Sequence, residues 1–432
     1  MICKNLTIST EGHLLFAGQD VASLLREYGS PLYLFDEDRI RENCRTYYNA
    51  MKEAFGEKAL PLYASKAASF KEIYRIVNSE QLGIDVVSCG EIYTAKAAGF
   101  DLSKTYFHSN NKTDEDIAFA IENGIGYFVA DNEEELYAVD RIAAEKGICQ
   151  KILLRLTPGI DTHTYEAINT GKVDSKFGSA IETGQAEAIT KLALKLPHLQ
   201  LMGFHCHVGS QVFDSDTFFR SAEIMLNFMA EMAKKHHYIA EELDLGGGYG
   251  VRYTESDPTI DIAANIHQVA DCVKTKCAAL GLPLPAIRLE PGRSIVADAG
   301  LTLYTVGTIK QIPGYKNYVS VDGGMTDNPR FALYNAPYTV VAAEKMNEET
   351  DFHCSVVGRC CESGDIIQEN VALPSTIKRG DVLAVLTTGA YNFSMASNYN
   401  RIPRLPVVML KEGTARLVVK RETLDDLIRN DI

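Results

Sequence analysis

The sequence predicts an α/β protein in which a (β/α)8 barrel is joined to a mostly antiparallel β domain. The first observation is that apolar runs alternate with segments of helical periodicity from Pro31 to about residue 300. The second is that this helical pattern then stops, and short alternating runs separated by Gly, Pro and Asn take over. At 432 residues the chain is long enough for two such domains.

Eight apolar runs in the first part have the length and composition of buried strands. They lie near residues 59–64, 83–88, 104–108, 125–129, 151–156, 200–207, 241–246 and 286–290. Most of the segments between them have helical periodicity, for example 114–122, 133–146, 218–237 and 260–280. This alternation over roughly 250 residues is typical of a (β/α)8 barrel, although an open doubly wound sheet has the same pattern.

The position of the polar residues favours the barrel over the open sheet. Residues that could carry chemistry follow or end seven different predicted strands: Lys66, Ser88, Glu91, His108, Asn110, Arg155, His207, Gly246 to Gly248 and Glu290. A barrel builds its active site from the loops at the C-terminal ends of its strands. We therefore expect one site at that end of a closed barrel.

The changes of pattern along the chain predict three segments. We expect residues 1–33, which contain LTIST and HLLFAG, to supply strands that join the β domain. Residues 34–298 would form the barrel, and residues 299–432 the β domain, as a small barrel or sandwich. The connection between residues 158 and 183 is longer than most loops, which predicts a lid or a binding loop.

The composition excludes several classes of function. A formal net charge of -14 argues against a surface for nucleic acid or anionic membranes, because such surfaces need clustered Lys and Arg. The chain begins without a secretory signal and has no apolar stretch near the roughly 20 residues of a membrane span. Ten scattered cysteines show no C-x-x-C spacing. We expect a cytoplasmic enzyme.

Lys66 ends the apolar run LPLYASKA, where a buried strand leaves the core. In one interpretation its aliphatic stem lies along apolar surface while the ammonium group reaches water. In the other, partial desolvation makes a neutral amine available to form an imine with a carbonyl group. The other unusual residues of the chain favour the second interpretation.

Two further strand ends offer sites for a flat, anionic ligand. Three consecutive glycines in LDLGGGYG make a tight turn or a phosphate cradle, but match neither G-x-G-x-x-G nor a Walker A motif. FHCHVGSQ places His205 and His207 on one face of a strand. The two histidines could bind a metal, although the sequence offers few further ligands. Alternatively, His207 could stack on a planar ring, with Ser210 beside it, and His205 would then be an ordinary core histidine.

A carboxylate and an arginine follow the last barrel strand in LEPGRS. Taken separately, Glu290 and Arg293 could form a solvated ion pair of small energetic value. Together with Lys66, His207 and the glycines they form a set: an amine that can form an imine, a carboxylate for a ring nitrogen, a stacking ring and a phosphate seat. The cofactor that needs all four is pyridoxal phosphate.

The chain resembles a known enzyme family along most of its length. The motifs that carry the resemblance run in order from about residue 31 to residue 404: YASKA, GIDVVSCGE, HSNNKT, LRLTPG, THTY with SKFG, GFHCHVGSQ, LDLGGGYG, EPGRSIVA, DGGMTDNPRFALY, VVGRCCESGDII and GAYNFSMASNYN. They are similar to the successive motifs of the diaminopimelate decarboxylases, which are fold-type III pyridoxal phosphate enzymes related to alanine racemase. The resemblance implies decarboxylation of meso-diaminopimelate to L-lysine and CO2, the last step of lysine biosynthesis.

The resemblance also implies a role for individual residues. Lys66 would bind the cofactor covalently, His207 would stack on its ring, and Glu290 would pair with the ring nitrogen. The remaining cofactor contacts would come from Asp85, Ser210, Gly247, Gly248, Pro291, Gly292, Arg293 and Tyr391. Substrate contacts would come from Arg293, Arg330, Tyr334, Glu362 and Tyr391, and no metal is implied.

Cys361 resembles the family's proton donor, which reprotonates the carbanion left by decarboxylation. In the family this segment reaches the site from the partner chain, so the resemblance implies a homodimer with active sites at the interface. A thiol can act as a general acid in this way. A racemase of this group would instead use an opposing tyrosine as its base, and Cys361 and Glu362 would have no role there.

The chain departs from the family pattern at two places, Phe331 and the segment from Ile402 to Val407. Both lie in the predicted β domain, which supplies most substrate contacts, so another basic or carrier-bound amino acid remains a second candidate for the substrate. From different functional classes, the sequence is also compatible with an inactive regulatory protein that binds pyridoxal phosphate and with a metal-dependent barrel hydrolase. The departures leave the cofactor residues unchanged.

Overall fold

The structure is a computed structural model, and it describes residues 1–160 and 175–432. The chain divides into two compact units, and each is described by itself. Unit 1 comprises residues 1–42, 251–258 and 293–432, and unit 2 comprises residues 43–250 and 259–292. None of the helices in the described ranges has the length and hydrophobicity that crossing a membrane requires.

Unit 2 is a closed barrel of eight parallel strands. Its strands are β5 (Leu60–Ala64), β6 (Gly83–Val86), β7 (Thr105–Phe107), β8 (Tyr127–Ala130), β9 (Gln150–Thr157), β11 (Leu199–His205), β12 (Glu242–Asp244) and β13 (Ala286–Leu289). They pair in the order β9, β11, β12, β13, β5, β6, β7 and β8, and β8 pairs back with β9 to close the ring. The prediction of a barrel rather than an open sheet is confirmed, and all eight predicted strands are present.

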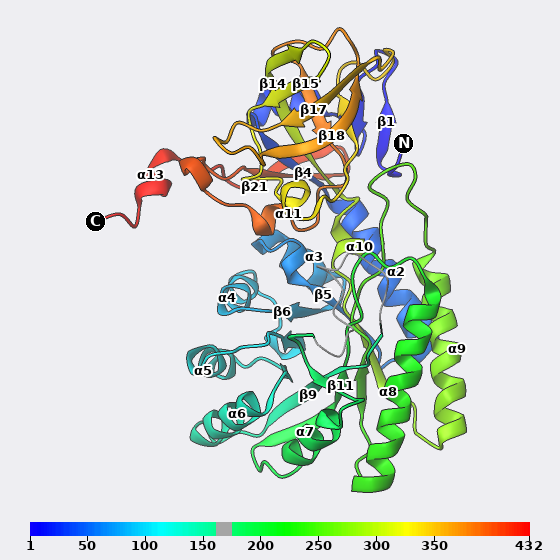
Figure 1. The fold of residues 1–432 in the computed structure, drawn as a ribbon. Coiled ribbons are helices and arrows are strands. Elements are labelled where there is room, and N and C mark those ends of the chain that lie inside the picture. The colour runs from blue at the N-terminus through cyan, green and yellow to red at the C-terminus, as the bar shows by residue number, and fades with distance from the viewer. Residues whose placement is uncertain (161–174) are drawn as a thin grey trace. The chain divides into compact units, whose positions relative to one another are not determined.

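Helices connect the strands of unit 2 and cover the outside of the barrel (Figure 1). They are α2 (Glu37–Phe55), which begins in unit 1, α3 (Lys71–Ser79), α4 (Cys89–Ala97), α5 (Asp114–Glu122), α6 (Glu133–Glu145), α7 (Gln185–Ala193), α8 (Ser215–His236) and α9 (Ile262–Leu280). Short elements are η1 (Ser65–Ala67), η2 (Leu102–Lys104) and β10 (Ser179–Ala180). Capping residues explain several helix ends: Asp261 accepts a hydrogen bond from Ala264 at the start of α9, and left-handed Gly281 ends it.

The starts of the barrel strands are tied together by a buried polar network. Tyr106 and Tyr127 each donate a hydrogen bond of 2.9 Å to the carboxylate of Glu242. Arg288 lies 3.0 Å from the same carboxylate. Beside this network the interior is apolar, with Leu62 and Leu153 fully buried. The N-terminal ends of the strands therefore stabilise the barrel, and the C-terminal ends are where an active site is expected.

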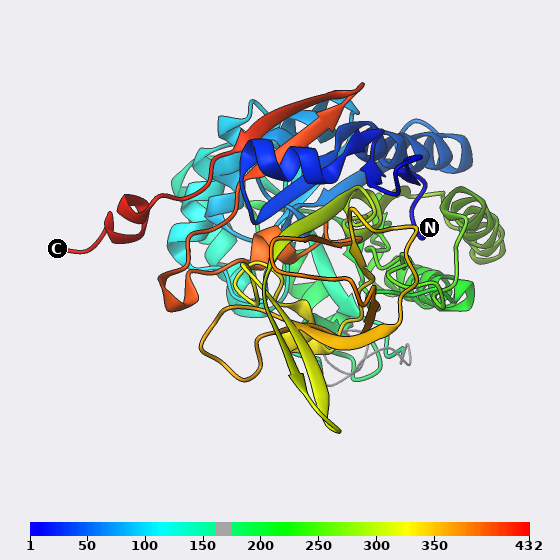
Figure 2. The same ribbon diagram turned by 90° about the horizontal axis from the view of Figure 1, so that it is seen from above.

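Unit 1 is built on a nine-stranded sheet that is mostly antiparallel. Its strands are β4 (Leu32–Asp36), β14 (Gly300–Ile312), β15 (Lys316–Val321), β16 (Val340–Ala342), β17 (Phe352–Val357), β18 (Ile366–Leu373), β19 (Val382–Val385), β20 (Val407–Lys411) and β21 (Thr414–Val419). Among these described strands, the parallel pairs are β15–β17 and β4–β20. The β14–β15 hairpin extends as a long ribbon (Figure 2), and Tyr315 at its turn is 90% exposed.

The N-terminal strands belong to unit 1 and form a small sheet of their own. β1 (Leu6–Ile8), β2 (Leu14–Phe16) and β3 (Gln19–Asp20) pair in that order. Phe16 of this sheet packs with Leu34 and Leu303 of the large sheet in one apolar core. The remaining helices of unit 1 are α1 (Val21–Tyr28), α10 (Arg293–Val296), α11 (Arg330–Tyr334), α12 (Asn392–Met395), η4 (Tyr399–Arg401) and α13 (Leu424–Ile428).

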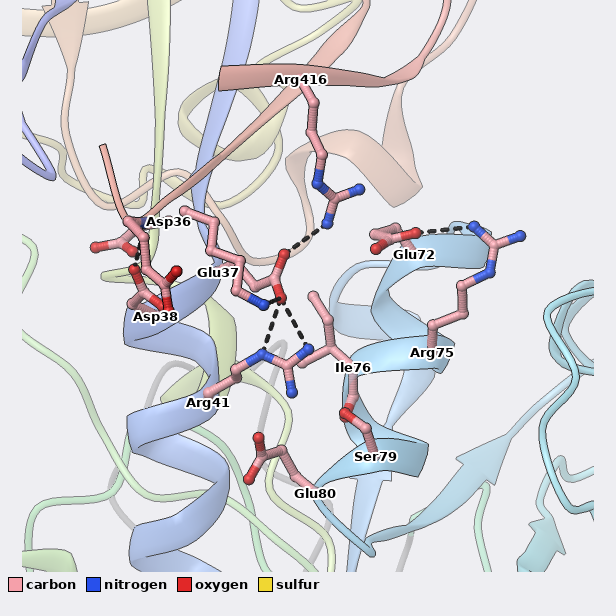
Figure 3. Close-up of polar contacts among 12 residues, drawn as sticks. Asp36, Glu37, Asp38, Arg41, Glu72, Arg75, Ile76, Ser79, Glu80 and Arg416 are labelled. Atoms are coloured by element: carbon pink, nitrogen blue, oxygen red, sulfur yellow. Dashed lines mark hydrogen bonds and ion pairs between the residues drawn. The ribbon is translucent and has the colours of Figure 1, made fainter. Parts of the chain in front are cut away.

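A buried carboxylate joins the start of α2 to the β20–β21 hairpin within unit 1 (Figure 3). Glu37 lies 2.8 Å from Arg41, 2.9 Å from Lys411 and 2.5 Å from Arg416. Burial alone would raise the pKa of Glu37, but these three cations outweigh it and lower the pKa to about 2. The ion cluster therefore fixes a helix start against a hairpin that lies about 370 residues further along the chain.

Candidate active site

The C-terminal ends of the barrel strands bring the predicted polar residues of unit 2 together. Lys66 follows β5, Asp85 lies in β6 and His108 follows β7. Arg155 lies in β9, His205 ends β11, the three glycines follow β12, and Glu290 follows β13. The structure therefore places seven strand ends around one region of unit 2, as the barrel interpretation predicts.

Lys66 lies in a short turn whose other two residues, Ser65 and Ala67, are buried, whereas its own side chain is exposed. Its ammonium group interacts electrostatically with Asp85, Glu91, His205 and His207. An amine that faces both carboxylates and imidazoles can exchange protons with its surroundings. The exposed side chain lacks the partial desolvation expected from the sequence, and the neighbouring carboxylates and imidazoles are what fit a lysine that forms an imine.

The loop after β13 holds the strand that precedes Lys66. The backbone N–H of Ala64 donates a hydrogen bond of 3.0 Å to the carbonyl of Pro291. A Cβ atom on Gly292 would lie 2.9 Å from the Cβ of Ala64, so a larger residue would displace this strand. Pro291 and Gly292, which were predicted to contact the cofactor, here position the residue two places before the lysine.

Glu290 is a buried carboxylate with an imidazole at each oxygen. Its Oε1 lies 2.7 Å from Nε2 of His108, and its Oε2 lies 3.2 Å from Nε2 of His205. Burial would raise the pKa of Glu290, but the facing His108 and His205 outweigh it and hold the pKa well below its usual range. Glu290 is therefore an anion at neutral pH, as a partner for a protonated ring nitrogen must be.

His207 is held against the glycine turn as a neutral ring. Its Nδ1 accepts a hydrogen bond of 3.3 Å from the backbone N–H of Gly247, so its proton lies on Nε2. Burial and the positive charges of Lys66 and Arg155 lower the pKa of His207 well below its ordinary value. A neutral imidazole can stack on an aromatic ring, which is the role predicted for His207.

The glycine turn lies too close to its neighbours for any side chain. A Cβ atom on Gly247 would lie 2.0 Å from the carbonyl oxygen of Glu290, and one on Gly248 would lie 2.4 Å from that of Gly209. Gly246 and Gly248 also have positive φ angles of 69° and 123°. The turn in LDLGGGYG is thus a surface of backbone atoms, in which the N–H groups of Gly246 and Gly247 already donate to Asp244 and His207. Ser210 lies in the neighbouring loop after β11.

The residues of unit 2 fit pyridoxal phosphate. Besides the amine, the anion, the neutral ring and the cradle, Asp85 offers unused hydrogen-bonding capacity. Its buried Oδ1 accepts no hydrogen bond from any residue that the structure describes. Burial raises the pKa of Asp85 to about 6, although the charge of His108 opposes the shift. A polar ligand in this region would satisfy that oxygen.

The metal interpretation gains one observation from the structure. His108, His205 and Glu290 present ligand atoms that all lie within 4.8 Å of one another. From the sequence we expect His205 to be an ordinary core histidine, whereas the structure gives it a carboxylate partner. The 3.2 Å separation from His205 is that of a hydrogen bond, and His108 makes a close electrostatic contact of 2.7 Å, so the cluster already has a role without an ion.

Unit 1 holds the predicted residues that follow the barrel. Tyr391 lies close to two guanidinium groups, with its ring centroid 4.9 Å from Cζ of Arg293 and 5.2 Å from Cζ of Arg330. Arg330 also lies over the ring of Tyr334, and its buried Nε has no hydrogen-bond partner in the described part of the chain. Two arginines beside a tyrosine offer bidentate donors for carboxylate or phosphate groups.

Tyr253 is a member of this group that the sequence did not reveal. Its hydroxyl accepts a hydrogen bond from Arg293, and its ring packs edge-on against Tyr338. Because Tyr253 follows the glycine turn in a loop without regular structure, its sequence neighbourhood gave no indication of this role.

Cys361 and Glu362 lie in an exposed loop of unit 1. Asn400 accepts a hydrogen bond of 2.9 Å from the backbone N–H of Cys361, and Asp365 accepts one of 2.7 Å from that of Cys360. Asp365 also accepts a bond of 2.6 Å from Met325, so it ties this loop to the loop that precedes α11. The thiol of Cys361 is therefore accessible on a loop with a defined backbone.

The departures from the family pattern have different surroundings. Leu405 is 2% exposed and Val407, in β20, is fully buried, so both contribute to the core of unit 1. Phe331 and Ile402 are only partly buried. The predicted lid falls largely on residues 161–174, which lie outside the described residues. Cζ of Arg155 lies 4.3 Å from the ring centroid of Phe177.

Comparison with known proteins agrees with this geometry. Residues 38–297 match the family model for the pyridoxal-binding domain of pyridoxal-dependent decarboxylases. Over 98% of the chain and 95% of the relative, the sequence is 45% identical to diaminopimelate decarboxylase of Bacillus subtilis. It is 45% identical to that of Staphylococcus aureus, over 97% of the chain and 98% of the relative. The chain belongs to the diaminopimelate decarboxylase family.

A solved structure supports the same relationship. The diaminopimelate decarboxylase of M. jannaschii in complex with L-lysine is similar with a TM-score of 0.90 and 33% sequence identity, covering 100% of this chain and 98% of that one. As a member of the diaminopimelate decarboxylase family, the chain is a carboxy-lyase that depends on pyridoxal phosphate. The predictions of fold, family and cofactor are confirmed.

Proposed function

We propose that this enzyme decarboxylates meso-diaminopimelate to L-lysine and CO2. The observation that carries the proposal is the cluster at the strand ends of unit 2, where an amine, an anionic carboxylate, a neutral imidazole and a glycine cradle converge in a member of this family. Relatives named diaminopimelate decarboxylase at 45% identity support the choice of substrate.

In this proposal the residues of unit 2 bind and tune the cofactor. Lys66 binds pyridoxal phosphate covalently through Nζ, and the backbone from Gly246 to Gly248 with Ser210 receives the phosphate group. His207 stacks on the ring, and Glu290 keeps the ring nitrogen protonated. When bound, the cofactor supplies an electron sink for the pair left by the departing carboxylate.

The residues of unit 1 bind the substrate and return a proton. Arg330 suits a carboxylate because its guanidinium is bidentate, and Glu362 suits the ammonium group at the far end of the substrate. Cys361 donates a proton from Sγ to the carbon that loses the carboxylate. The ring of Tyr391 lies close to both guanidinium groups, with its centroid 4.9 Å from Cζ of Arg293 and 5.2 Å from Cζ of Arg330.

We also propose that the active enzyme is a homodimer. Cys361 and Glu362 are exposed in the single chain, which suits residues that serve the site of a second copy. Mixing two inactive variants, Lys66→Ala and Cys361→Ala, tests this assignment. If each site combines residues from both chains, on the order of a quarter of the wild-type activity returns after subunit exchange. If each site is built from one chain, the mixture stays inactive.

A cytoplasmic location is supported by the cysteines. All ten are free, as expected for a protein that works in a reducing compartment.

The test of the reaction is a mass analysis of the products formed from purified protein, pyridoxal phosphate and meso-diaminopimelate. The proposal predicts lysine and CO2 in equal amounts. Bound cofactor with untouched substrate would contradict the choice of substrate but not the family. In that case other basic amino acids are the next candidates, because Phe331 and the segment 402–407 depart from the family pattern in the unit that binds the substrate.

A further inference from the structure

The two histidines that face Glu290 come from different parts of the barrel. His108 follows β7, His205 ends β11, and Glu290 follows β13. Their rings approach edge to face, with centroids 4.9 Å apart and an interplanar angle of 71°. His205 is 1% exposed, His108 6% and Glu290 7%, so water is largely excluded from all three. Neither histidine takes part in the steps of the proposed function.

The hydrogen bonds fix the proton on His205. An ionised carboxylate only accepts hydrogen bonds, so Nε2 of His205 must be the donor to Oε2 of Glu290. Its Nδ1 is buried and has no hydrogen-bond partner among the residues that the structure describes. The ring is therefore neutral, with its single proton directed at Glu290. An orphaned nitrogen on the far side of this ring indicates that the ring is kept for its Nε2–H bond.

Nε2 of His108 faces two carboxylates. It lies 2.7 Å from Glu290 and 3.9 Å from Asp85. It therefore contacts Glu290 directly and Asp85 more distantly, but neither contact has the geometry of a hydrogen bond. His205 therefore occupies one acceptor position on Oε2 of Glu290, whereas His108 approaches Oε1 at 2.7 Å without the geometry of a hydrogen bond. Each oxygen of a carboxylate has a second lone pair, so Glu290 can still accept a bond from a ring nitrogen.

We propose that His108 and His205 are positioning residues that hold Glu290 as an oriented anion for the ring nitrogen of the cofactor. This inference rests on the proposed function, because it assigns that nitrogen to Glu290. The low pKa of Glu290, which burial opposes and the two histidines produce, agrees with the geometry. Without these two imidazoles, a carboxyl group at this depth would take up a proton and could no longer keep the pyridine nitrogen protonated.

Other charged and titratable groups surround Glu290 and must be considered in any pH profile. They are Lys66 after β5, Asp85 in β6, Arg155 in β9, His207 after β11 and Asp244 in β12. Burial and the neighbouring Glu290 raise the pKa of Asp244 well above its usual range. Lys66 and Arg155 are the cations that could replace the histidines as the source of the effect.

Substitution of each histidine by Gln and by Met tests the proposal in the holoenzyme. Gln carries an N–H donor near the position of Nε2, whereas Met has a similar length and no donor. The cofactor is labelled with ¹⁵N at the pyridine nitrogen, and its NMR signal is followed against pH. We expect His108→Met and His205→Met to lower the pH at which this nitrogen deprotonates by about one unit or more.

The kinetic readout separates positioning from packing. In the Met variants kcat should fall about 10- to 100-fold with little change in KM, and the Gln variants should recover most of the loss. His236→Met is the matched control, because Nε2 of His236 makes a similar 2.9 Å contact with Glu187, at the end of α8. It should change neither the nitrogen signal nor kcat.

Two results would overturn the inference. One is that the pyridine nitrogen of the cofactor titrates in the folded Met variants as it does in the wild type. That result would mean that Lys66 and Arg155, and not the histidines, keep Glu290 ionised. The other is a proton on Nδ1 of His205, seen by ¹⁵N NMR of the wild-type histidines, and this measurement applies even if the Met variants do not fold. A nitrogen that stays protonated in Glu290→Gln would instead contradict the role of Glu290 in the proposed function.

Discussion

Two buried carboxylates, Glu290 in unit 2 and Glu37 in unit 1, are both held as anions but by different partners. Glu37 is surrounded by two arginines and a lysine, as Figure 3 shows for Arg41 and Arg416. Glu290 faces two imidazoles. Permanent cations saturate a carboxylate and fix the fold around it, whereas imidazoles keep it ionised and leave acceptor capacity for a ligand.

The contrast extends to where the two residues lie. Glu37 is the first residue of a helix and links that helix to a hairpin, so replacing it should lower the stability of the whole of unit 1. Glu290 follows a barrel strand at the end where catalytic residues lie, so replacing it should lower the rate of the reaction. The difference teaches that a low carboxylate pKa alone does not mark a catalytic residue; the type of partner does.

The largest effect on turnover is expected for Lys66→Ala, which removes the amine proposed to hold the cofactor together with Glu290. Turnover should fall by at least about three orders of magnitude, because the cofactor loses the amine that binds it covalently in the proposed function. The unfolding temperature should stay near that of the wild type. Lysine production and thermal unfolding measure the two outcomes. Exposed Lys71, five residues away in α3, gives the matched control Lys71→Ala, which should behave as wild type.

The next effect separates chemistry from cofactor binding. Cys361→Ala should lower kcat by roughly 100-fold, the usual size of a lost general acid, while cofactor affinity stays within about twofold. Steady-state kinetics and cofactor titration measure the two quantities. Cys149→Ala is the control, because Cys149 is the other exposed cysteine among the ten. Equal losses of activity and cofactor affinity would mean that Cys361 is structural.

A smaller effect is expected on the stability of the protein at low pH, where the contribution of Glu37 can be measured. The folded pKa of Glu37 is lowered to about 2, below an unfolded value near 4.3. Ionised Glu37 therefore stabilises the folded state above the unfolded pKa, and this contribution is lost as the pH falls toward 2. In urea unfolding, the free energy of unfolding of the wild type should exceed that of Glu37→Gln by the full amount at pH 6 and by much less at pH 3. A difference that stays constant with pH would contradict the ion cluster.

The sequence predicted the barrel because each of its strands is a short apolar run bounded by polar residues, as LPLYA and AIRL illustrate. Residues such as Lys66 and Glu290 were predicted as candidates because they follow such runs. The parallel pairing of β4 with β20 left no comparable pattern, since it joins residues more than 370 positions apart.

The partners of Glu290 could not be predicted, for the same physical reason. His108 and Glu290 are 182 positions apart, and only closure of the barrel brings them to 2.7 Å. His205 lies on a strand whose neighbours are buried, so its sequence context is that of a core residue. Tyr253 lies in a loop that the contacts assign to unit 1 although its flanking segments belong to unit 2. Local pattern carries no information about such long-range contacts.

The most direct test of this account compares Glu290→Gln with Glu37→Gln by turnover and by thermal unfolding in the same preparation. Glu290→Gln should lower kcat about 100-fold or more and leave the unfolding temperature within about 2 °C. Glu37→Gln should leave kcat within about twofold and lower the unfolding temperature by about 5–10 °C, because three cations lose their anion. An active Glu290→Gln enzyme, or a Glu37→Gln enzyme that is stable but inactive, would contradict the division between a carboxylate for chemistry and a carboxylate for the fold.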